Sequence, residues 1–551
     1  MNEEYDYIIV GAGSSGCVLA NRLSADPQAG VLLVESGPPD NSPLIHMPRG
    51  IGKLLNPGNP HVWSYQAKQG PGHGTEDWLK GRTLGGSSSV NGMVYLRGHP
   101  AEYDAWETAG CTGWGWKDIG RCYQAMEDHE LGAGEGRGAG GPLKISMHPG
   151  GNPLCEAVIA AAEEMGVARV EDINGALHGG IGYQPRTIWR GKRQSAAKAF
   201  LDPVRQRPNL TIATGADVLR VVFEGLRAVG VELRAGDGSP ARVARARREV
   251  ILSAGALNTP KILQLSGVGP GADLARLGIP VVADIPEVGR HLLEHRCIMM
   301  RIRVRSGSLN REFAGWRLLK NLGRYFLGGS GPMTHAAHEV CAFVKTRPEL
   351  ERPDAELGIG LYSIVVRDGK IELETEPGMT WVGYFTNPDS EGSVMITSRD
   401  PGAAPAIDAN YLDTERDKRH SIALLRFMRK MLHQPALRKL VVAEVAPGPD
   451  CNTDAQLEEA FFSEGSTAFH AAGTCRMGAD PASVVDPQCR VRGLQGLRVV
   501  DTSIMPTLIS GNTNGPAMAM AMRAAELILA QPAQRGAASS GVKSSTTIAY
   551  T

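Results

Sequence analysis

The order of apolar and polar residues is most regular at the start of the chain. Tyr5–Val10 ("YDYIIV") is an apolar run of strand length that leads directly into the glycine-rich stretch "GAGSSG". The following "CVLANRL" has helical apolar spacing until "SADPQAG" interrupts it, and a second apolar run, Val31–Val34, ends at Glu35. A buried strand, a helix and a second buried strand in this order predict a βαβ unit.

The glycines of this unit fit the binding of a dinucleotide. Gly11, Gly13 and Gly16 have GxGxxG spacing, and Glu35 follows the last of them by 19 residues. The first glycine permits a tight turn, the second lets the backbone approach a pyrophosphate at the helix N-terminus, and the third lets helix and strand pack closely. Glu35 is expected to accept hydrogen bonds from ribose hydroxyls. The glycines alone would be a weak signal, but the complete strand, helix, strand and acid predict a dinucleotide site.

Gly81–Gly98 ("GRTLGGSSSVNGMVYLRG") is a second glycine-rich segment. A flexible surface loop is the alternative interpretation, but Val90, Met93, Val94 and Leu96 make the segment too apolar for a solvated linker. The pattern therefore favours a buried loop that lies along a ligand.

Two later segments complete the pattern. Arg247–Pro270 predicts an apolar strand, a short Ser-Ala-Gly turn, and a helix from about Asn258 to a glycine-rich end. Near the C-terminus the pattern predicts a strand, then Asp501, a turn-rich stretch, and a long apolar helix after Pro516.

Charge and composition narrow the classes of partner. In 551 residues, 58 Lys and Arg balance 58 Asp and Glu, so the net charge predicts binding to neither nucleic acid nor an anionic membrane. The acidic N-terminus lacks the pattern of a signal peptide, and no apolar run is long enough to cross a bilayer. We therefore expect a cytoplasmic protein, or one peripheral to the inner membrane. Nine scattered cysteines without a CxxC pair predict free, mostly buried thiols.

Five motifs in one order carry a resemblance to a known family. GxGxxG with its terminal acid, "GGSSSVNG", "ILSAGALNTP", "HAAGTCRMG" and "SGNTNGP" resemble the glucose-methanol-choline (GMC) family of flavoproteins, and within it the choline- and alcohol-dehydrogenase-like bacterial members. The likeness extends from about Tyr5 to about Leu529. It implies an α/β fold in which a discontinuous Rossmann-like FAD-binding domain carries an inserted α+β substrate domain with an antiparallel sheet.

The resemblance also implies domain boundaries. The FAD-binding domain would comprise residues 1–155, 205–300 and 470–532, and the substrate domain residues 156–204 and 301–469. The remaining residues, 533–551, have the composition of a solvated, disordered tail.

The family implies which residues contact FAD. Gly11, Gly13 and Gly16 would hold the pyrophosphate and Glu35 the ribose. The other positions assigned to the cofactor on this likeness are Ser14, Ser15, Ser36, Arg82, Gly85, Ser87, Asn91, Gly92, Met93, Val94, Val218 (beside adenine), Ser253, Ala254, Gly255, Asp501, Asn512 and Thr513. Some members tether FAD covalently through a histidine immediately before the loop asparagine. Val90 occupies that position, so we expect noncovalent FAD.

His470, in "HAAGTCRMG", matches the catalytic base of the family, and Asn512 matches its partner. Oxidation of an alcohol removes a hydroxyl proton and a hydride from one C–OH unit. Histidine, with an ordinary pKa of about 6.5, can accept that proton at neutral pH. Asn512 would donate a hydrogen bond to the developing alkoxide.

Two histidine clusters invite a metal-site interpretation. "HLLEH", His291 to His295, fits an inverted zinc-peptidase motif, which requires both histidines on one helical face and a third ligand. The family pattern at this position is N-L-x-D-H, so His291 and Glu294 are departures from it. Glu391 is another, because relatives commonly carry Ser-Arg-Gly there. We predict no metal site.

In "THAAHEV", His335, His338 and Glu339 lie within the predicted substrate domain. Glu339 matches a position that faces the substrate cavity in some relatives, where a carboxylate can hold a cationic substrate. The alternative is a group of solvent-facing polar residues.

Three function hypotheses follow from these residues. The first is FAD-dependent oxidation of a primary alcohol, with oxygen or a quinone-like carrier as electron acceptor. The second is a flavin-containing lyase that cleaves hydroxynitriles without redox turnover. The third, a binding protein that has lost catalysis, is disfavoured because His470 and Asn512 are both present.

Overall fold

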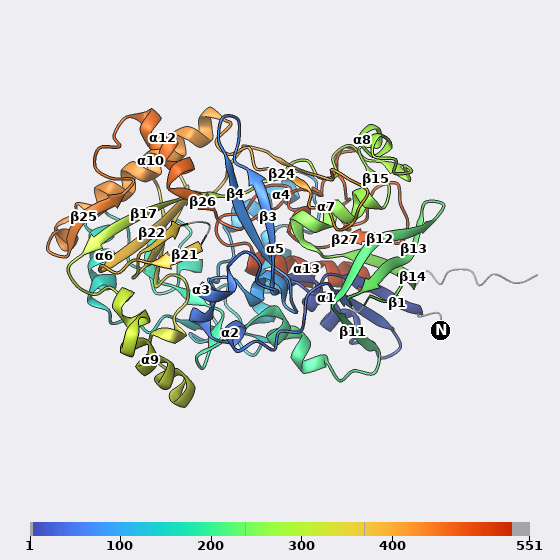
Figure 1. Cartoon of the computed structure of the whole chain (residues 1–551), viewed down its shortest axis with the longest axis horizontal. Helices are drawn as coiled ribbons and strands as arrows, with labels where there is room; N and C mark the ends of the chain where they lie inside the picture. Colours follow the sequence, from blue (N-terminus) through green and yellow to red (C-terminus); the bar gives the residue numbers. More distant parts are fainter. Residues whose placement is uncertain (1–3, 237, 368–369, 532–551) are drawn as a thin grey trace, which may run out of the picture.

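The computed structural model describes residues 4–236, 238–367 and 370–531. Figure 1 shows two large sheets on opposite sides of the hairpin formed by β3 and β4 (Val62–Lys68 and Thr75–Gly81). Each sheet has its own apolar core. No helix within the described ranges has both the length and the apolarity needed to span a bilayer.

The first sheet contains the strands of the predicted βαβ unit. Its order is β11-β2-β1-β14-β13-β12, with β27 also paired to β14. The strands β11, β2, β1, β14 and β27 run parallel, whereas β12 and β13 form an antiparallel extension. Their bounds are β1 Glu4–Val10, β2 Val31–Glu35, β11 Leu210–Thr214, β12 Ala216–Glu224, β13 Arg227–Ala235, β14 Arg242–Leu252 and β27 Leu497–Val499. The α/β class is confirmed.

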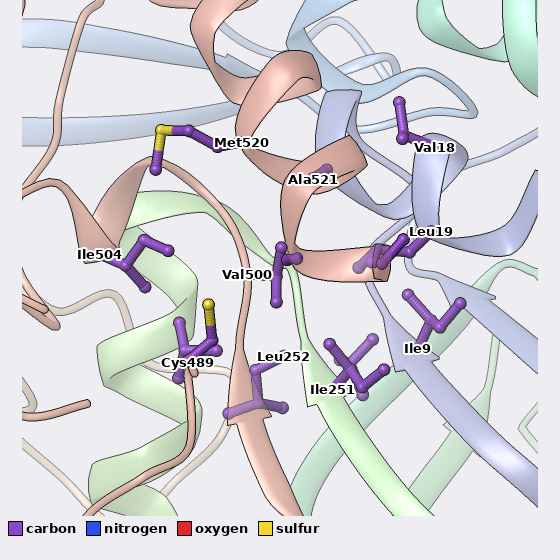
Figure 2. Close-up of a cluster of buried hydrophobic side chains, with 14 of the residues drawn as sticks. Ile9, Val18, Leu19, Ile251, Leu252, Cys489, Val500, Ile504, Met520 and Ala521 are labelled. Atoms are coloured by element: carbon purple, nitrogen blue, oxygen red, sulfur yellow. The ribbon is translucent and has the colours of Figure 1, made fainter. Parts of the chain in front are cut away.

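Two helices from opposite ends of the chain pack together over this sheet. α1 (Ser14–Leu23) contacts α13 (Asn514–Leu529), and α13 also contacts α5 (Trp116–Met126). Figure 2 shows α1, α13 and the strand ends enclosing a cluster of buried side chains. Because the apolar faces of both helices meet the parallel strands, the terminal segment is bound firmly to the N-terminal unit.

The second sheet is antiparallel throughout, as expected for the substrate domain. Its order is β25-β17-β22-β19-β18-β7, with β26 paired to β17. The bounds are β7 Gly180–Tyr183, β17 Arg296–Val304, β18 Val340–Val344, β19 Ala355–Gly360, β22 Gly378–Phe385, β25 Val441–Ala446 and β26 Gly465–Thr467. α10 (Glu415–Leu432) packs on β22 and contacts α6 (Pro153–Glu163) and α12 (Asp454–Ser463).

Some segments join the two predicted domains. β3 belongs to the segment predicted for the FAD-binding domain, but it pairs with β24 (Ala406–Asp408) from the other. The π-helix η4 (Ala197–Leu201) lies before the predicted boundary at 205 and packs against α1.

Two helices begin at other residues than the sequence predicted. α7 (Gly255–Leu265) begins three residues before the predicted position, because Asp501 accepts hydrogen bonds from the Gly255 amide, at 2.9 Å, and from the Thr259 hydroxyl, at 2.6 Å. α13 begins at Asn514 rather than after Pro516, and a proline in the first turn is tolerated because its missing N–H has no helical partner there.

The predicted state of the cysteines is confirmed. All nine are free, and eight of them are buried. The predicted tail, 533–551, lies outside the described residues.

Candidate active site

A cavity of about 1310 Å³ extends from the N-terminus of α1 to one face of the second sheet. It brings together segments that are hundreds of residues apart. The residues assigned from sequence that line it are Gly11, Gly13, Ser14, Ser15, Glu35, Ser36, Arg82, Ser87, Asn91, Gly92, Met93, Val94, Val218, Ser253, Ala254, Gly255, His338, His470, Asp501, Asn512 and Thr513.

Gly16, Gly85, His335 and Glu339 are absent from this lining. Gly16 has a packing role, because a Cβ there would lie 1.9 Å from the Gly11 carbonyl oxygen. The Gly85 amide donates to the Ala12 carbonyl at 2.8 Å, which attaches the 81–98 loop to the βα turn.

The α1 end of the cavity fits a dinucleotide. Gly13 caps α1 without a side-chain hydrogen bond, so amides of the first turn are free to bind an anion. A Cβ on Gly13 would meet only the Ser253 carbonyl oxygen, at 3.9 Å, so the backbone is open on that side. Ser14 donates to the Asn514 side-chain oxygen at 2.7 Å and thereby aligns the first turns of α1 and α13.

Glu35 is fixed by two backbone amides. Its carboxylate oxygens accept from Ala12 N and Gly37 N, both at 2.9 Å. Burial raises the pKa of Glu35 to about 7 despite these bonds. Each oxygen retains acceptor capacity toward the cavity, which suits a carboxylate that binds ribose hydroxyls.

The 81–98 loop is held by a buried arginine that the sequence did not single out. Arg193 donates to the carbonyl oxygens of Ser88, at 3.2 Å, and Asn91, at 2.8 Å. Met93 has φ +61°, an uncommon conformation for a residue other than glycine. Val90 is buried and lines the cavity, where it offers no nucleophilic atom.

His470 lies at the other end of the cavity, between two hydrogen-bonding partners. Its Nε2 is 2.9 Å from the Asn512 Nδ2, and its Nδ1 is 2.9 Å from the His295 Nδ1. The His295 Nε2 is 2.8 Å from the Thr386 carbonyl oxygen. The Asn512 side-chain oxygen is buried and has no protein partner, so it is available to a ligand donor.

These partners fix the tautomer of His470. A carbonyl oxygen only accepts, so the His295 Nε2 carries the hydrogen toward Thr386. Burial lowers the pKa of His295 to about 4, so its ring is neutral and its Nδ1 accepts from the His470 Nδ1. The lone pair of His470 is therefore on Nε2, beside Asn512.

The surroundings keep His470 neutral. Burial, together with the neighbouring His295 and Lys80, lowers the pKa of His470 well below its ordinary value. The preceding residue, Phe469, has φ +63°, and its carbonyl accepts from the Lys80 ammonium at 2.8 Å. Glu294 accepts from the amides of both His295, at 3.0 Å, and His470, at 2.8 Å.

One face of the second sheet also lines the cavity. Alternate residues of three strands line the cavity: Cys297, Met299 and Arg301; Glu356 and Gly358; Thr380, Val382 and Tyr384. The Tyr384 ring stacks on His295, with centroids 4.4 Å apart, and its hydroxyl donates to Glu356. Burial raises the pKa of Glu356 to about 7.

The cavity lining does not include Glu339, and this residue does not face solvent either, so its position matches neither of the two interpretations left open by the sequence. Its carboxylate is fully buried and lies 2.6 Å from the Arg49 guanidinium. Its other oxygen accepts from the Leu361 amide at 2.8 Å. Burial alone would raise the pKa of Glu339, but Arg49 and His335 lower it to about 2. The neighbouring His338 lines the cavity instead, over Gly358.

His335 belongs to the same buried group as Glu339. Ligand atoms of His148, His335 and Glu339 lie within 4.8 Å of one another. However, Arg49 already neutralises the carboxylate, so this group lacks the negative charge that would favour a metal ion.

The helical face required by the HLLEH motif does not form. Residues 291–295 form no helix: Leu292 and Leu293 make isolated bridges, and His291 has φ +56°. The His291 Nδ1 instead lies 2.8 Å from Glu391, so two departures from the family pattern contact each other. His295, noticed in the sequence only as a possible metal ligand, is the partner of His470. In the sequence, the only feature that pointed to His295 was its position after the acidic residue of the N-L-x-D-H pattern.

Comparisons with known proteins agree with this geometry. The N-terminal family model described as GMC oxidoreductase matches residues 5–297, and the C-terminal model matches residues 388–521. The chain is 41% identical over 530 residues to the alcohol dehydrogenase [acceptor] of Pseudomonas putida, covering 95% of this chain and 96% of that protein. It is 38% identical to the oxygen-dependent choline dehydrogenase of Escherichia coli, with 96% of each covered. Among solved structures, the pyridoxine 4-oxidase from Mesorbium loti superposes with a TM-score of 0.85 at 32% identity, covering 95% of this chain and 98% of the other.

Proposed function

Because the chain belongs to the GMC oxidoreductase family and is an FAD-dependent oxidoreductase acting on CH–OH donors, we propose that it oxidises a primary alcohol to the aldehyde with His470 as the base. The observation that carries this proposal is the hydrogen-bonded chain from Thr386 through His295 to His470, which leaves the His470 Nε2 without a proton and bonded only to the Asn512 amide.

The residues present fit FAD. The uncapped first turn of α1 would bind the pyrophosphate, and Glu35 the ribose. Val90, where a tethering histidine would stand, supports noncovalent attachment. Bound FAD supplies an acceptor for the hydride of the carbinol carbon.

His470 performs the proton transfer. In the alcohol complex the hydroxyl donates to the His470 Nε2, and its proton moves there as the C–H bond gives up its electron pair. The resulting imidazolium retains its Nδ1 bond to His295. In this structure the Asn512 amide donates to the His470 Nε2 at 2.9 Å. In the alcohol complex it would turn from Nε2 to the alcohol oxygen and donate there as negative charge develops.

The division of the chain into a discontinuous FAD-binding domain and an inserted substrate domain is part of this proposal. Support comes from the separate cores of the two sheets, with the cavity between them. The lyase alternative is disfavoured, since the relatives identified are named dehydrogenases and an oxidase. The acceptor is oxygen or a quinone-like carrier.

Anaerobic titration tests the proposal. Primary alcohols of aliphatic, aromatic and cationic classes are added to the purified holoenzyme, and at least one should bleach the flavin absorbance band while aldehyde forms in equal amount. A flavin that stays oxidised while a hydroxynitrile is cleaved would establish the lyase instead.

Precipitation in acid tests the mode of attachment. FAD should appear in the supernatant in the amount of the protein, because Val90 provides no atom for a covalent bond. Flavin that stays with the precipitated chain would contradict noncovalent binding.

A further inference from the structure

α9 (Gly315–Gly328) has three distinct faces, and only one packs on the protein. Leu318, Leu322 and Tyr325 are spaced as one helical face and contact a small buried cluster with Met47 and Met333. Figure 1 shows α9 projecting from the body of the molecule at its lower left.

A second face of α9 carries large apolar side chains in solvent. Trp316, Leu319, Phe326 and Leu327 are 67%, 70%, 67% and 93% exposed. Their spacing, with Gly323 among them, places them along a single ridge. Single exposed apolar residues are common on soluble proteins, but a continuous ridge of this kind marks an interaction surface.

The third face of α9 is basic. Arg317, Lys320 and Arg324 are spaced by three and four residues and flank the apolar ridge, and α9 contains no acidic residue. Arg317 pairs with Glu312 at 3.1 Å, whereas within the described residues no carboxylate pairs with Lys320 or Arg324. The turn at Arg190 touches the C-terminal end of α9 and adds an exposed basic side chain.

We propose that α9 is an interfacial helix that docks this enzyme on an anionic lipid surface. An exposed ridge of Trp, Leu and Phe flanked by Lys and Arg suits the boundary between acyl chains and negatively charged headgroups. A folded protein partner would more commonly offer carboxylates to the basic residues at the rim of an interface, and a complementary pocket to the apolar residues at its centre. Four apolar side chains on one convex helix instead form a ridge that suits a deformable apolar phase.

Docking through α9 would bring the cavity near the lipid. α9 packs on the segment around Met47, which continues into α3 (Ile51–Leu54). Ile51 and Leu55 line the cavity. The balanced net charge of the chain does not reveal this surface, because it averages over charges that are separated in space.

Vesicle sedimentation tests the proposal with the FAD-loaded full chain. The protein is mixed with vesicles of equal parts phosphatidylcholine and phosphatidylglycerol, or of phosphatidylcholine alone. We expect binding to the anionic vesicles and much weaker binding to the neutral ones. Raising the salt from about 0.1 M to about 1 M should weaken it, because the screening length falls from about 10 Å to about 3 Å.

Two variants separate the contributions of the apolar and the basic residues of α9 to vesicle binding. Leu319→Ser/Phe326→Ser should lower the vesicle affinity roughly 100-fold or more, since two large side chains no longer enter the apolar layer. Lys320→Gln/Arg324→Gln should lower it roughly 25-fold, at about fivefold for each basic residue. The matched control, Leu226→Ser/Val442→Ser, removes two exposed apolar side chains elsewhere and should bind as the wild type does.

All variants change exposed residues, so FAD content and the thermal midpoint should match the wild type and establish folding. Wild-type protein that remains in the supernatant with anionic vesicles would overturn the proposal, as would α9 variants that bind equally well. Light scattering that finds a wild-type dimer and a monomeric Leu319→Ser/Phe326→Ser variant would identify a second copy as the occupant and would also overturn it.

Discussion

Two buried groups of histidines in this protein differ in how their polar atoms are satisfied. In the Glu339 group, the carboxylate is paired with Arg49 at 2.6 Å and bonded to the Leu361 amide at 2.8 Å. In the His470 group, the Nε2 accepts from the Asn512 Nδ2 at 2.9 Å, and the Asn512 side-chain oxygen beside it has no protein partner. The carboxylate of the first group is fully paired within the protein, although the Arg49 Nε and the His148 Nε2 have no partner, whereas the second group has an unpaired oxygen that faces the cavity.

This difference distinguishes a structural group from a candidate catalytic group better than the types of residue in each group do. Both groups contain histidines, and each lies near a buried carboxylate. A buried charge is tolerated where a counter-charge compensates it, and such a pair has little left to offer a substrate. An unsatisfied acceptor beside a cavity is costly unless a ligand uses it. The contrast leads to four predictions, in order of decreasing effect.

Replacement of His470 should have the largest effect. General-base catalysis contributes roughly 10²- to 10⁴-fold, so His470→Ala should slow anaerobic flavin reduction by about that factor while FAD stays bound. Stopped-flow absorbance measures the step. Asn512→Ala should slow it less, because the base remains. A His470→Ala enzyme that reduces its flavin at nearly the wild-type rate would assign the base elsewhere, and His338 would be examined first.

The Glu339 group should respond in stability instead. Glu339→Gln leaves Arg49 buried without its counter-charge, which costs about 3–5 kcal/mol, measured by denaturant unfolding. The matched control Glu224→Gln breaks the exposed pair with Arg245 and should cost less than about 1 kcal/mol. The KM ratio of a cationic and a neutral alcohol should not change. A selective rise in KM for the cationic alcohol would return Glu339 to the substrate site.

His295 should act through His470. His295→Phe removes the acceptor that fixes the His470 tautomer, so kcat should fall roughly 10- to 100-fold with little change in KM, as for other residues that orient a functional imidazole. His295→Gln should recover part of the rate, because its side-chain oxygen can accept from Nδ1. Equal rates in His295→Phe and wild type would show that the tautomer needs no such support.

The smallest effect concerns pH. Since the pKa of His470 is lowered below 6.5, the ring stays neutral as pH falls through 6.5, and protonation of the base removes activity only at lower pH. Log kcat/KM should therefore show no break from His470 between pH 7.5 and 6. Lys80→Met removes one cause of the lowered pKa and should move the acid limb to higher pH. An acid limb centred near 6.5 in the wild type would contradict the burial of the base.

The parts of the fold that are encoded locally could be predicted. β1, α1 and β2 follow from an apolar run, glycine spacing and a second run that ends in an acid. The start of α7 could not, because its first turn is held by Asp501 from a distant segment. Likewise, "HLLEH" has helical spacing, but Leu292 and Leu293 pair with Gly392 and Ala472 in isolated bridges.

By itself, the sequence determined the family and the dinucleotide unit, and it indicated His470 and Asn512 as the candidate catalytic residues, because each of these depends on residues in short, ordered motifs. The tertiary structure decided which polar atoms are left unsatisfied. The pairing of Glu339 with Arg49, of His291 with Glu391 and of His470 with His295 joins segments 100 to 290 residues apart. The exposed ridge of α9 was decided in the same way, since a helical pattern does not show which of its faces the rest of the chain covers.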